Sequence, residues 1–553
     1  MKVIAVLQAD LEVTPIGTRS RLADELRGVP VLRRTVERVR RVKSIAEVHV
    51  LCPSSQTARC GAILAGTGAM VCAHDAARPP WASLVRTARK WSLDGWRGGI
   101  GGTTTFEEYT DCRLIDGLLK TAPADAVLSI PPAAPVFDPD LAQRMIDHRR
   151  TAEDDARLTF TQAPPGLAGV LLDTALVKEL SESNIPIGVL FSYKPDAPRK
   201  DLIFQSCCCE IPAPLRFAVG RLIADTERSM RTLAALLGDH ESPDATTIGT
   251  WLTEREKTHV EPVPREVEIE LTTDDPYAHA LLRPRGDRVP RRGPIDPALV
   301  ERVITEMAVH DDALCVLGGF GDPLRHPCFP SILERIRPVQ RPEGRDLYGL
   351  CVRTSAVDLG KEQIEAIVAH GVDVLTVTLD AWTPDLYGRL QSPHDPRQAD
   401  LQQVLDRLDR LTQGREREGS PRPIIVPEMT KAVENVHELD AFYDGWLRRF
   451  GTVSITGYSH FAGQCPDRSV IKMAPAARTA CRRIRSRCLI LADGSLAMCD
   501  QDFRGQHTLG RLGEQSLTSL WRSAAFERLR ASHRNAQYDP TPLCARCEDW
   551  HRP

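Results

Sequence analysis

The stretch C-R-R-I-R-S-R-C-L-I-L-A-D-G-S-L-A-M-C-D, from Cys481 to Asp500, decides how the C-terminal part of this chain folds, together with L-C-A-R-C-E-D-W around Cys544 and Cys547. The runs R-C-L-I-L and L-A-M-C indicate two short strands, joined by an Asp-Gly pair that is typical of a hairpin turn. The hairpin brings two thiols together, and a C-x-x-C pair lets two more sulfurs point at one metal or cluster. The sequence therefore predicts a site closed by four thiolates.

A helical segment, S-L-T-S-L-W-R-S-A-A-F-E-R-L-R, separates the two cysteine pairs. Its large apolar side chains recur at helical spacing, so they are expected to lie on one face and to fold the two halves together. These side chains are Leu517, Leu520, Trp521 and Phe526.

The whole series forms a pattern: C-x12-G-x4-C from Cys481 through Gly494 to Cys499, then D-x-D, a G-R-L-G-E-Q-S-L-T-S-L-W-R-S segment and C-x-x-C. It resembles the SPASM domain, the auxiliary iron–sulfur module that follows many radical SAM enzymes. The resemblance implies one [4Fe–4S] cluster, with Cys488 as a substitute candidate among the ligands. A tetrathiolate zinc site is the alternative, because spacing alone does not choose the metal. The implied ligands are Cys481, Cys499, Cys544 and Cys547.

Composition describes an ordinary globular protein of 553 residues, 42% hydrophobic, with a net charge of -3. A chain of this length forms more than one domain. Neither sign of charge dominates, so we expect no nucleic acid and no membrane surface as partner. The start M-K-V-I-A-V-L-Q-A-D is not a signal peptide, and no apolar run is long enough to span a membrane. Sixteen cysteines without such a signal favour a reducing compartment, and a cytoplasmic location is expected.

The N-terminal part begins with a strand from Val3 to Leu7, a helix over V-L-R-R-T-V-E-R-V-R-R-V and a strand from Val48 to Cys52. This βαβ order predicts a parallel sheet covered by helices. The loop after the first strand of such a sheet is a common place for a nucleotide, because strand ends and helix N-termini converge there.

That loop continues as I-G-T-R-S-R-L-A-D-E-L-R-G-V-P-V-L-R-R-T-V-E-R-V, which resembles nucleotidyltransferases of the CMP-sugar synthetase and spore-coat-polysaccharide type. The resemblance implies a nucleotide-binding loop at Gly17, Arg19 and Arg21. Glu25 stands where the family has a lysine, and Ala133 stands where it has a metal-binding aspartate. We therefore expect residues 1–237 to keep the fold and to have lost transferase activity, since a triphosphate would lack its charge stabilisation.

A glycine-rich run between Arg89 and Tyr109 is a further candidate site in this part of the chain. Arg89, Lys90 and Arg97 could pair with an anion that the glycine backbone approaches. The alternative is a loop packed over its two tryptophans.

Residues 238–264 are polar and lose apolar periodicity, so an exposed linker is expected there. Beyond it, strand-like runs such as E-V-E-I-E-L-T and V-D-V-L-T-V-T-L-D-A alternate with helix-like runs such as K-E-Q-I-E-A-I-V-A-H. Repeated βα units predict a full or partial barrel over 265–470, followed by the cysteine-bearing module over 471–553.

The order and wording of these units resemble the radical SAM core, in which the first strand is followed by C-x3-C-x2-C and its cluster. Here Asp275, His279 and Leu282 occupy the three cysteine positions. Leucine ligates nothing, and a carboxylate and an imidazole are harder donors than thiolates. Reductive cleavage of S-adenosylmethionine is therefore not expected.

A second part of that core is better matched. The run G-G-F-G-D-P resembles the G-G-x-G-E-P segment that cradles the methionine amino group of S-adenosylmethionine, which implies residual binding. The alternative is that the glycines only preserve tight strand-to-helix turns. The implied binding residues are Gly318, Gly319, Gly321 and Asp322.

The three blocks in this order resemble the spiro-SPASM proteins, in which a nucleotidyltransferase-like domain, a radical-SAM-like barrel and a SPASM module are joined. We predict an α/β, multidomain iron–sulfur protein with an inactive radical SAM core that binds a peptide or a nucleotide-sugar. Whether it is an enzyme stays open. The alternatives are a radical SAM/SPASM enzyme that modifies a peptide or sugar, and a sugar nucleotidyltransferase.

Overall fold

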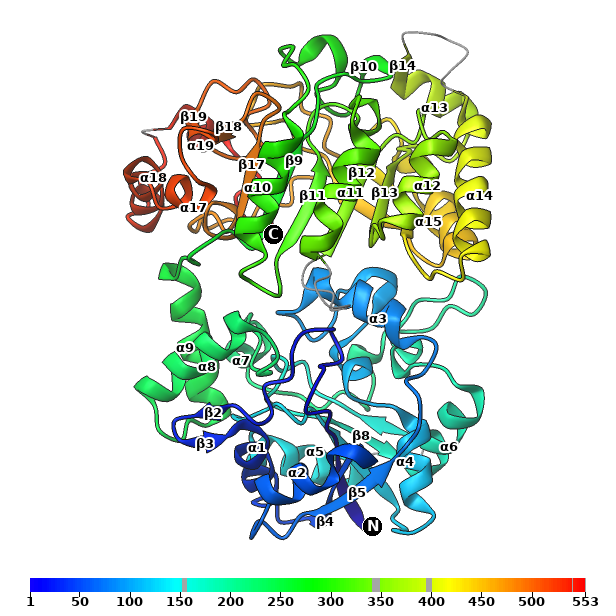
Figure 1. Ribbon diagram of the computed structural model, residues 1–553, viewed down its shortest axis with the longest axis vertical. Helices are drawn as coiled ribbons and strands as arrows, with labels where there is room; N and C mark the ends of the chain where they lie inside the picture. The colour runs from blue at the N-terminus through cyan, green and yellow to red at the C-terminus, as the bar shows by residue number, and fades with distance from the viewer. Residues whose placement is uncertain (152–156, 341–348, 394–399, 540, 553) are drawn as a thin grey trace. The chain divides into compact units, whose positions relative to one another are not determined.

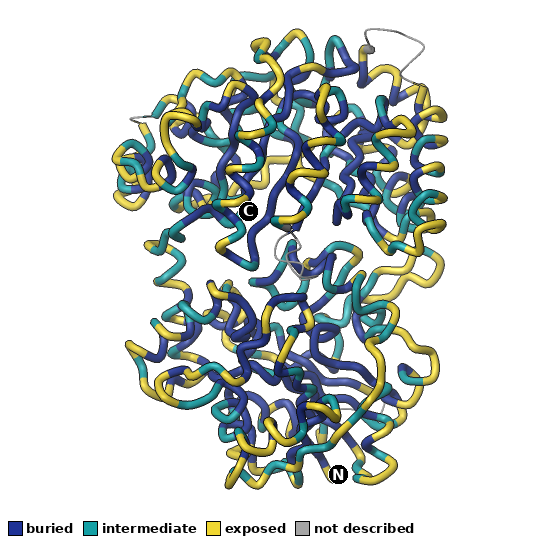
Figure 2. Tube along the Cα trace, viewed as in Figure 1, coloured by how far each residue is buried: buried dark blue, intermediate teal, exposed yellow. Residues whose placement is uncertain are grey.

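The computed structural model describes residues 1–151, 157–340, 349–393, 400–539 and 541–552. The chain divides into two units, Met1–Glu256 and Lys257–Pro553. Both are built on largely parallel sheets whose strands are buried, while loops and outer helix faces are exposed (Figure 2). This confirms the predicted α/β fold class. Within the described ranges, no helix combines the length and the apolar character that crossing a membrane requires.

Unit 1 contains a six-stranded sheet in the order β5-β4-β1-β6-β8-β7. The first four strands in this order are parallel, and β8 and β7 complete the sheet in antiparallel pairings. The predicted βαβ opening is confirmed. The strands are β1 (Val3–Gln8), β4 (Ile45–Pro53), β5 (Met70–His74), β6 (Ala126–Ile130), β7 (Leu158–Thr159) and β8 (Val170–Asp173); β2 (Glu25–Leu26) and β3 (Val29–Pro30) form a separate small hairpin.

Both faces of this sheet are buried, as the alternation along β1 shows. Val3, Ala5 and Leu7 belong to one apolar core, whereas Ile4 and Val6 belong to the other. The covering helices are α1 (Val31–Val39), α2 (Thr57–Ile63), α3 (Ala82–Arg89), α4 (Cys112–Leu119), α5 (Pro139–Thr151), α6 (Thr174–Ser183), α7 (Ala213–Arg216), α8 (Glu227–Asp239) and α9 (Ala245–Thr258).

Helix α9 falls within the segment 238–264, where an exposed linker was expected. Ala245, Ile248 and Leu252 are buried in the apolar core of unit 1. The buried positions recur every three to four residues, a helical period that the threonines and the glycine of A-T-T-I-G-T-W-L make hard to recognise. Most of this segment is therefore part of unit 1.

Unit 2 contains a nine-stranded sheet in the order β16-β15-β13-β12-β11-β9-β17-β18-β19. From β9 to β16 neighbouring strands are parallel and follow chain order, with helices between them, which is the arrangement of a partial (β/α) barrel (Figure 1). The strands are β9 (Glu266–Glu270), β11 (Leu314–Gly318), β12 (Gly349–Thr354), β13 (Val374–Thr378), β15 (Ile424–Lys431) and β16 (Ser454–Gly457); the helices are α10 (Pro297–Met307), α11 (Phe329–Gln340), α12 (Lys361–Ala369), α13 (Pro384–Leu390), α14 (Leu401–Arg417) and α15 (Leu439–Phe450).

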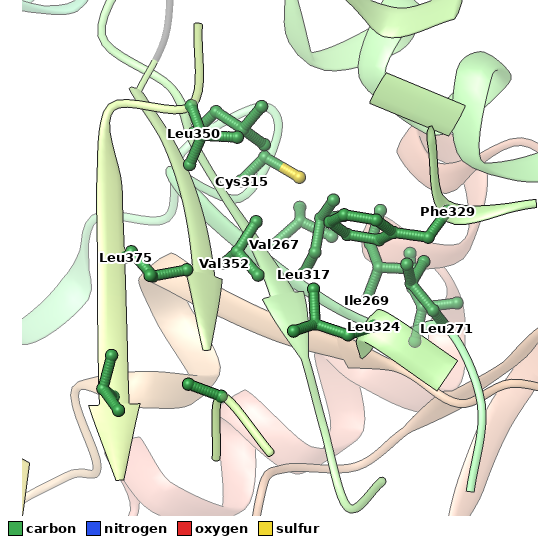
Figure 3. Packing of buried hydrophobic residues seen from close by; sticks show 14 of the residues in the cluster. Val267, Ile269, Leu271, Cys315, Leu317, Leu324, Phe329, Leu350, Val352 and Leu375 are labelled. Atoms are coloured by element: carbon green, nitrogen blue, oxygen red, sulfur yellow. The ribbon is translucent and has the colours of Figure 1, made fainter. Parts of the chain in front are cut away.

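The sequence E-V-E-I-E of β9 shows how the barrel is lined. Val267 and Ile269 pack outward against the helices, among residues such as Leu317 and Phe329 (Figure 3). The side chain of Glu266 lies on the opposite face of the strand, where it makes an ion pair with Arg487. The core of the barrel therefore lies between the sheet and the helices, and its interior is charged.

The cysteine-bearing module continues this sheet. Strand β17 (Arg487–Ile490) pairs in parallel with β9, and the predicted hairpin follows with β18 (Ser495–Ala497) and β19 (Thr508–Arg511). Arg487 donates to Glu266 at 2.6 Å across this junction. The remaining helices are α16 (Arg483–Ser486), α17 (Leu517–Trp521), α18 (Ala524–Arg534) and α19 (Pro542–Arg546).

The predicted helical segment between the cysteine pairs is confirmed, as two helices rather than one. Helix α17 ends at Trp521, and Ser523 accepts a hydrogen bond from Phe526 N as the N-cap of α18. Leu517, Leu520, Trp521 and Phe526 are all buried in the core of unit 2.

Candidate metal centre

The hairpin positions the first two cysteines. Gly494 turns the chain at a φ of +85°, and the Asp493 carboxylate accepts from Ser495 N at 3.0 Å, so the Asp-Gly turn forms as the sequence predicts. The short helix α16 separates Cys481 from the first strand of the hairpin, and Cys499 lies two residues after the end of its second strand. The two thiols thus lie at the same end of the hairpin.

The C-x-x-C pair is shaped by a one-turn helix. Thr541 precedes Pro542, which occupies the first helical position of α19, and Ala545 N donates to Thr541 O at 3.0 Å. Cys544 lies within this turn and Cys547 ends it. Two residues between them bring both sulfurs to the same side of the turn.

All four cysteines line one small cavity, with residues from the hairpin, α18 and α19. Cys481 and Cys544 are buried, and Cys499 and Cys547 are half-buried. The structure therefore brings together the four side chains that the sequence singled out as ligands. The other residues of this lining include Arg478, Arg483, Ile484, Met498, Asp500, His533, Leu543, Asp549 and Trp550.

Burial keeps these thiols protonated in the absence of a metal. It raises the pKa of Cys544 to about 11 and that of Cys547 to about 12, and it also raises the pKa values of Cys481 and Cys499. A bound metal deprotonates its thiol ligands outright, so these raised pKa values imply that metal binding releases protons.

The arrangement of the thiols bears on what they could hold. The four thiols line one shared cavity. A [4Fe–4S] cluster is held in this way, because its cysteines surround a core of irons and sulfides rather than a single ion. The four residues therefore fit the implied cluster.

Cys488, the substitute candidate, lies elsewhere. It is buried in β17, and burial raises its pKa strongly, with Glu266 and Cys315 nearby. It lines a different cavity, inside the barrel, and is not among the residues around the four cysteines.

Two side chains that the sequence did not single out, Arg483 and His533, lie beside the sulfurs. Arg483 makes an ion pair with Asp500, the first aspartate of the D-x-D motif, next to Cys499. His533 on α18 lies with Nε2 3.3 Å from Cys544 Sγ, while its Nδ1 accepts from Cys481 N at 3.3 Å. Burial, with Arg478 and Arg485 nearby, lowers the pKa of His533 to about 4. No spacing rule connects these residues to the cysteines, so only the folded chain reveals them.

A second, larger cavity inside the barrel reaches the same place. It has a volume of about 470 Å³ and shares Cys499, Arg483 and Asp500 with the lining of the cysteine cavity. Its walls carry paired charges: Arg353 donates to Glu268 at 3.0 Å. Cys499 therefore lies between a cysteine-lined cavity and a polar one.

The loop that resembles the radical SAM cluster motif is arranged differently. Asp275 is buried against Arg285 at 3.1 Å, and burial raises its pKa to about 6. Leu282 is buried in the apolar core. His279 lies on β10 (Tyr277–Ala280), which pairs with β14 (Gln391–Pro393), and burial lowers its pKa. Asp275 thus belongs to an ion pair, Leu282 to the apolar core and His279 to a two-stranded sheet.

The S-adenosylmethionine-like segment is also engaged by the protein itself. The Asp322 carboxylate is buried and accepts from Thr354 Oγ1 at 2.8 and 2.9 Å, and from N and Oγ of Ser355 at 2.9 and 2.6 Å. It also caps the following turn by accepting from Leu324 N at 3.1 Å. Its oxygens therefore hold the T-S-A turn after β12.

Close packing accounts for the glycines of that segment. Gly319 has a φ of +82°, and a Cβ there would meet the Glu270 side chain at 2.5 Å. At Gly321 a Cβ would overlap the backbone of Thr272 and Thr273, and at Gly318 it would lie 3.0 Å from Glu268. Backbone approach to β9 is thus sufficient to require small residues here.

In unit 1, the loop with Gly17, Arg19 and Arg21 is a small closed turn whose cations have protein partners. Arg19 makes an ion pair with Asp24, and Arg21 donates to Asp225 O at 3.0 Å. Gly17 has a φ of +90°. Next to this loop, at the carboxyl ends of β1 and β6, a cavity of about 310 Å³ is lined by residues including Arg21, Asp10 and Tyr109.

The arginines of the glycine-rich run are structural. Arg89 is fully buried and donates to Glu108 at 2.7 Å, and Arg221 pairs with the same carboxylate at 2.7 Å. Arg97 pairs with Asp201 at 2.6 Å. These pairs favour the packed-loop interpretation of this run over an anion site.

Comparison with known families supports the C-terminal assignment. Residues 481–548 match the family model for SPASM, described as an iron-sulfur cluster-binding domain. The C-terminal module is a SPASM domain. The match begins at Cys481 and includes Cys499, Cys544 and Cys547.

Solved structures similar to this chain include SuiB of Streptococcus suis bound to precursor peptide SuiA, at 12% identity over 55% of this chain and 75% of that chain, with a TM-score of 0.40. BtrN in complex with AdoMet and 2-DOIA matches at 16% identity over 52% and 93%, with a TM-score of 0.32. A cytidylyltransferase from Leptospira borgpetersenii serovar Hardjo-bovis (strain JB197) matches at 16% identity over 46% and 93%, also with a TM-score of 0.32.

A relative in Treponema pallidum (strain Nichols), an uncharacterized protein, is 30% identical over 131 residues. The match covers 23% of this chain and 34% of the relative. The chain thus spans about a third of the length of the curated relative that it matches.

Proposed function

We propose that this chain is an iron–sulfur protein that holds one [4Fe–4S] cluster through Cys481, Cys499, Cys544 and Cys547. The observation that carries the proposal is that these four thiols, which come from two segments far apart in the sequence, line one cavity. When bound, such a cluster supplies one-electron transfer and a rigid cross-link, and four cysteine ligands leave no open iron for substrate.

The residues around the thiols support this proposal. The backbone N–H of Asp549 donates to Cys547 Sγ at 3.3 Å, and His533 lies at the same distance from Cys544 Sγ. Arginines 478 and 483 line the same cavity. N–H donors and nearby cations stabilise thiolates, which the cluster requires.

We further propose that the barrel does not cleave S-adenosylmethionine. The positions of the family's three cysteines are taken by Asp275, His279 and Leu282, and the first of these is already paired with Arg285. The five hydrogen bonds to Asp322 also leave its oxygens little capacity for a ligand's amino group. Bound S-adenosylmethionine and its conversion to 5′-deoxyadenosine would instead support the alternative, a radical SAM/SPASM enzyme.

The role of the cluster is then to support a ligand in the barrel cavity next to Cys499. Arg353 Nε and Arg483 Nε are both buried and lack a hydrogen-bond partner among the described residues, and both arginines line this cavity. Unpaired N–H groups favour a ligand that brings oxygen acceptors, as a peptide or a nucleotide-sugar does. A polar ligand of this kind is the partner that we propose.

A second candidate function belongs to unit 1. Its cavity lies at the carboxyl ends of β1 and β6, where the chain order of the parallel strands reverses, and ligands of α/β sheets commonly bind at such a point. Because Arg19 and Arg21 already have protein partners, we propose that this cavity binds a ligand without transferring a nucleotide. Pyrophosphate released from a nucleoside triphosphate and a sugar would contradict this and support the transferase alternative.

Analysis of iron, acid-labile sulfide and zinc after anaerobic purification tests the central proposal. We expect about four irons and four sulfides per chain and no stoichiometric zinc. One zinc per chain without iron would overturn the proposal and make the module a structural zinc site.

A further inference from the structure

His533 connects the two cysteine pairs of the SPASM domain. It lies near the end of α18 and is 4% exposed. Its Nδ1 is 3.3 Å from the backbone N of Cys481, and its Nε2 is 3.3 Å from Cys544 Sγ. One imidazole thus contacts a cysteine from each half of the site.

These two contacts fix the position of the ring proton. A backbone N–H can only donate, so Nδ1 must be the acceptor in its contact with Cys481. A neutral imidazole then carries its proton on Nε2, the nitrogen that faces Cys544. The contact with the sulfur is therefore an N–H···S hydrogen bond in which His533 donates.

Neighbouring side chains hold the ring in this orientation. Tyr538 packs edge-on against the imidazole, with ring centroids 5.1 Å apart, and Arg478 lies over the Tyr538 ring at 4.0 Å. Arg478 also donates to Cys544 O at 2.7 Å. The donor and the cysteine that it faces are thus held by the same group of residues.

We propose that His533 is a positioning residue that donates an N–H···S bond to Cys544 and thereby raises the reduction potential of the cluster. This rests on the proposed function, since it requires a cluster at Cys544. Reduction adds negative charge to the cluster and its thiolates, and a hydrogen bond to a ligand sulfur stabilises the more negative state. Removing the donor therefore makes the cluster harder to reduce.

The test compares the midpoint potentials of the anaerobically purified wild type, His533→Phe and His533→Gln, each with its iron content. Phenylalanine keeps a planar ring without a donor, and glutamine keeps an N–H donor on a side chain of similar reach. Ser532→Ala, on the same helix, is the matched control. We expect all four proteins to hold the same iron, His533→Phe to be shifted to a more negative potential, and His533→Gln to lie between it and the wild type.

The outcomes separate this inference from the function on which it rests. Wild type without iron would contradict the proposed function itself. Wild type with full iron and a His533→Phe potential equal to or more positive than that of the wild type would overturn the inference alone. Loss of iron in both His533 variants would also overturn it, because a group that only tunes the potential is not needed to hold the metal. Loss of iron in His533→Phe alone would overturn the inference for the same reason.

Discussion

Two places in unit 2 resemble the cluster sites of radical SAM proteins, and they differ in how far their polar groups are already satisfied. Around the SPASM cysteines, four thiols line a cavity and N–H groups point at their sulfurs. In the loops after β9 and β11, the carboxylates of Asp275 and Asp322 are bound by Arg285 and by the T-S-A turn, respectively. The comparison teaches that polar groups left without a partner in the protein indicate a ligand site better than a familiar order of residue types does.

The largest expected effect comes from the C-x-x-C pair. Cys544→Ala with Cys547→Ala removes two of four ligands and is expected to reduce the iron content from about four per chain to nearly none. Cys465→Ala is the matched control, since that half-buried cysteine does not line the cavity. Iron analysis of the purified proteins checks this. Full iron in the double variant would break the comparison by placing the cluster elsewhere.

The second effect concerns the stability of the barrel. Asp322→Ala leaves the hydroxyl and N–H donors of Thr354, Ser355 and Leu324 without their acceptor, and we expect a cost of about 4 kcal/mol in the free energy of unfolding of unit 2. Asp358→Ala is the control, because its partly exposed pair with Arg325 is worth about 0.5 kcal/mol. Thermal unfolding measures both. Unchanged stability together with lost S-adenosylmethionine binding would show that Asp322 serves a ligand.

The third effect is a pH dependence. Burial holds the pKa of Asp275 at about 6, above the ordinary value of 3.8, although Arg285 lies 3.1 Å away. The folded chain therefore keeps this proton to a higher pH than the unfolded chain does. Its contribution is fully present below pH 3.8 and is lost as the pH rises through 6, roughly 2 to 3 kcal/mol in total.

Asp275→Asn is expected to remove this decline, so the slope of the free energy of unfolding of unit 2 against pH becomes more positive between about pH 4 and pH 6. The exposed neighbour Asp274, changed to asparagine, is the matched control. Denaturant unfolding at several pH values measures the slope. The same slope in the wild type and in Asp275→Asn would mean that the Asp275 carboxylate is not held protonated by the fold.

The smallest effect sharpens the ligand set. Cys488 lines the barrel cavity and not the cysteine cavity, so Cys488→Ala is expected to keep the full iron content. The cost of the lost sulfur is on the order of 1 kcal/mol in stability. Comparison with Cys481→Ala gives the assignment: if Cys488→Ala loses iron and Cys481→Ala keeps it, the two cysteines exchange roles.

Much of the C-terminal module could be predicted from the sequence, because its signals are local. The Asp-Gly turn, the C-x-x-C spacing and the apolar side chains at Leu517, Leu520 and Trp521 each act within a few residues. What the sequence could not show are contacts between distant segments. The pairing of β17 with β9 and the contact of His533 with Cys544 depend on the folded chain, and no spacing rule connects them.

At the two weaker resemblances, the structure shows contacts within the protein for the side chains that the motifs single out. Gly319 and Asp322 match a cofactor motif as letters, yet a close approach to Glu270 and a turn after β12 account for both. In unit 1, Arg19 and Arg21 match a nucleotide loop but have protein partners. In both places the side chains that match the motif are engaged by the protein itself, and ligand binding there stays a prediction.

Mössbauer spectra of the anaerobically purified wild type, with total iron per chain, test the central claim most directly. One cluster at the SPASM cysteines and none in the loop after β9 predicts about four irons in a single [4Fe–4S] component, all lost in the Cys544→Ala/Cys547→Ala variant. About eight irons, half of which survive in that variant, would contradict the account by showing a second cluster in the barrel.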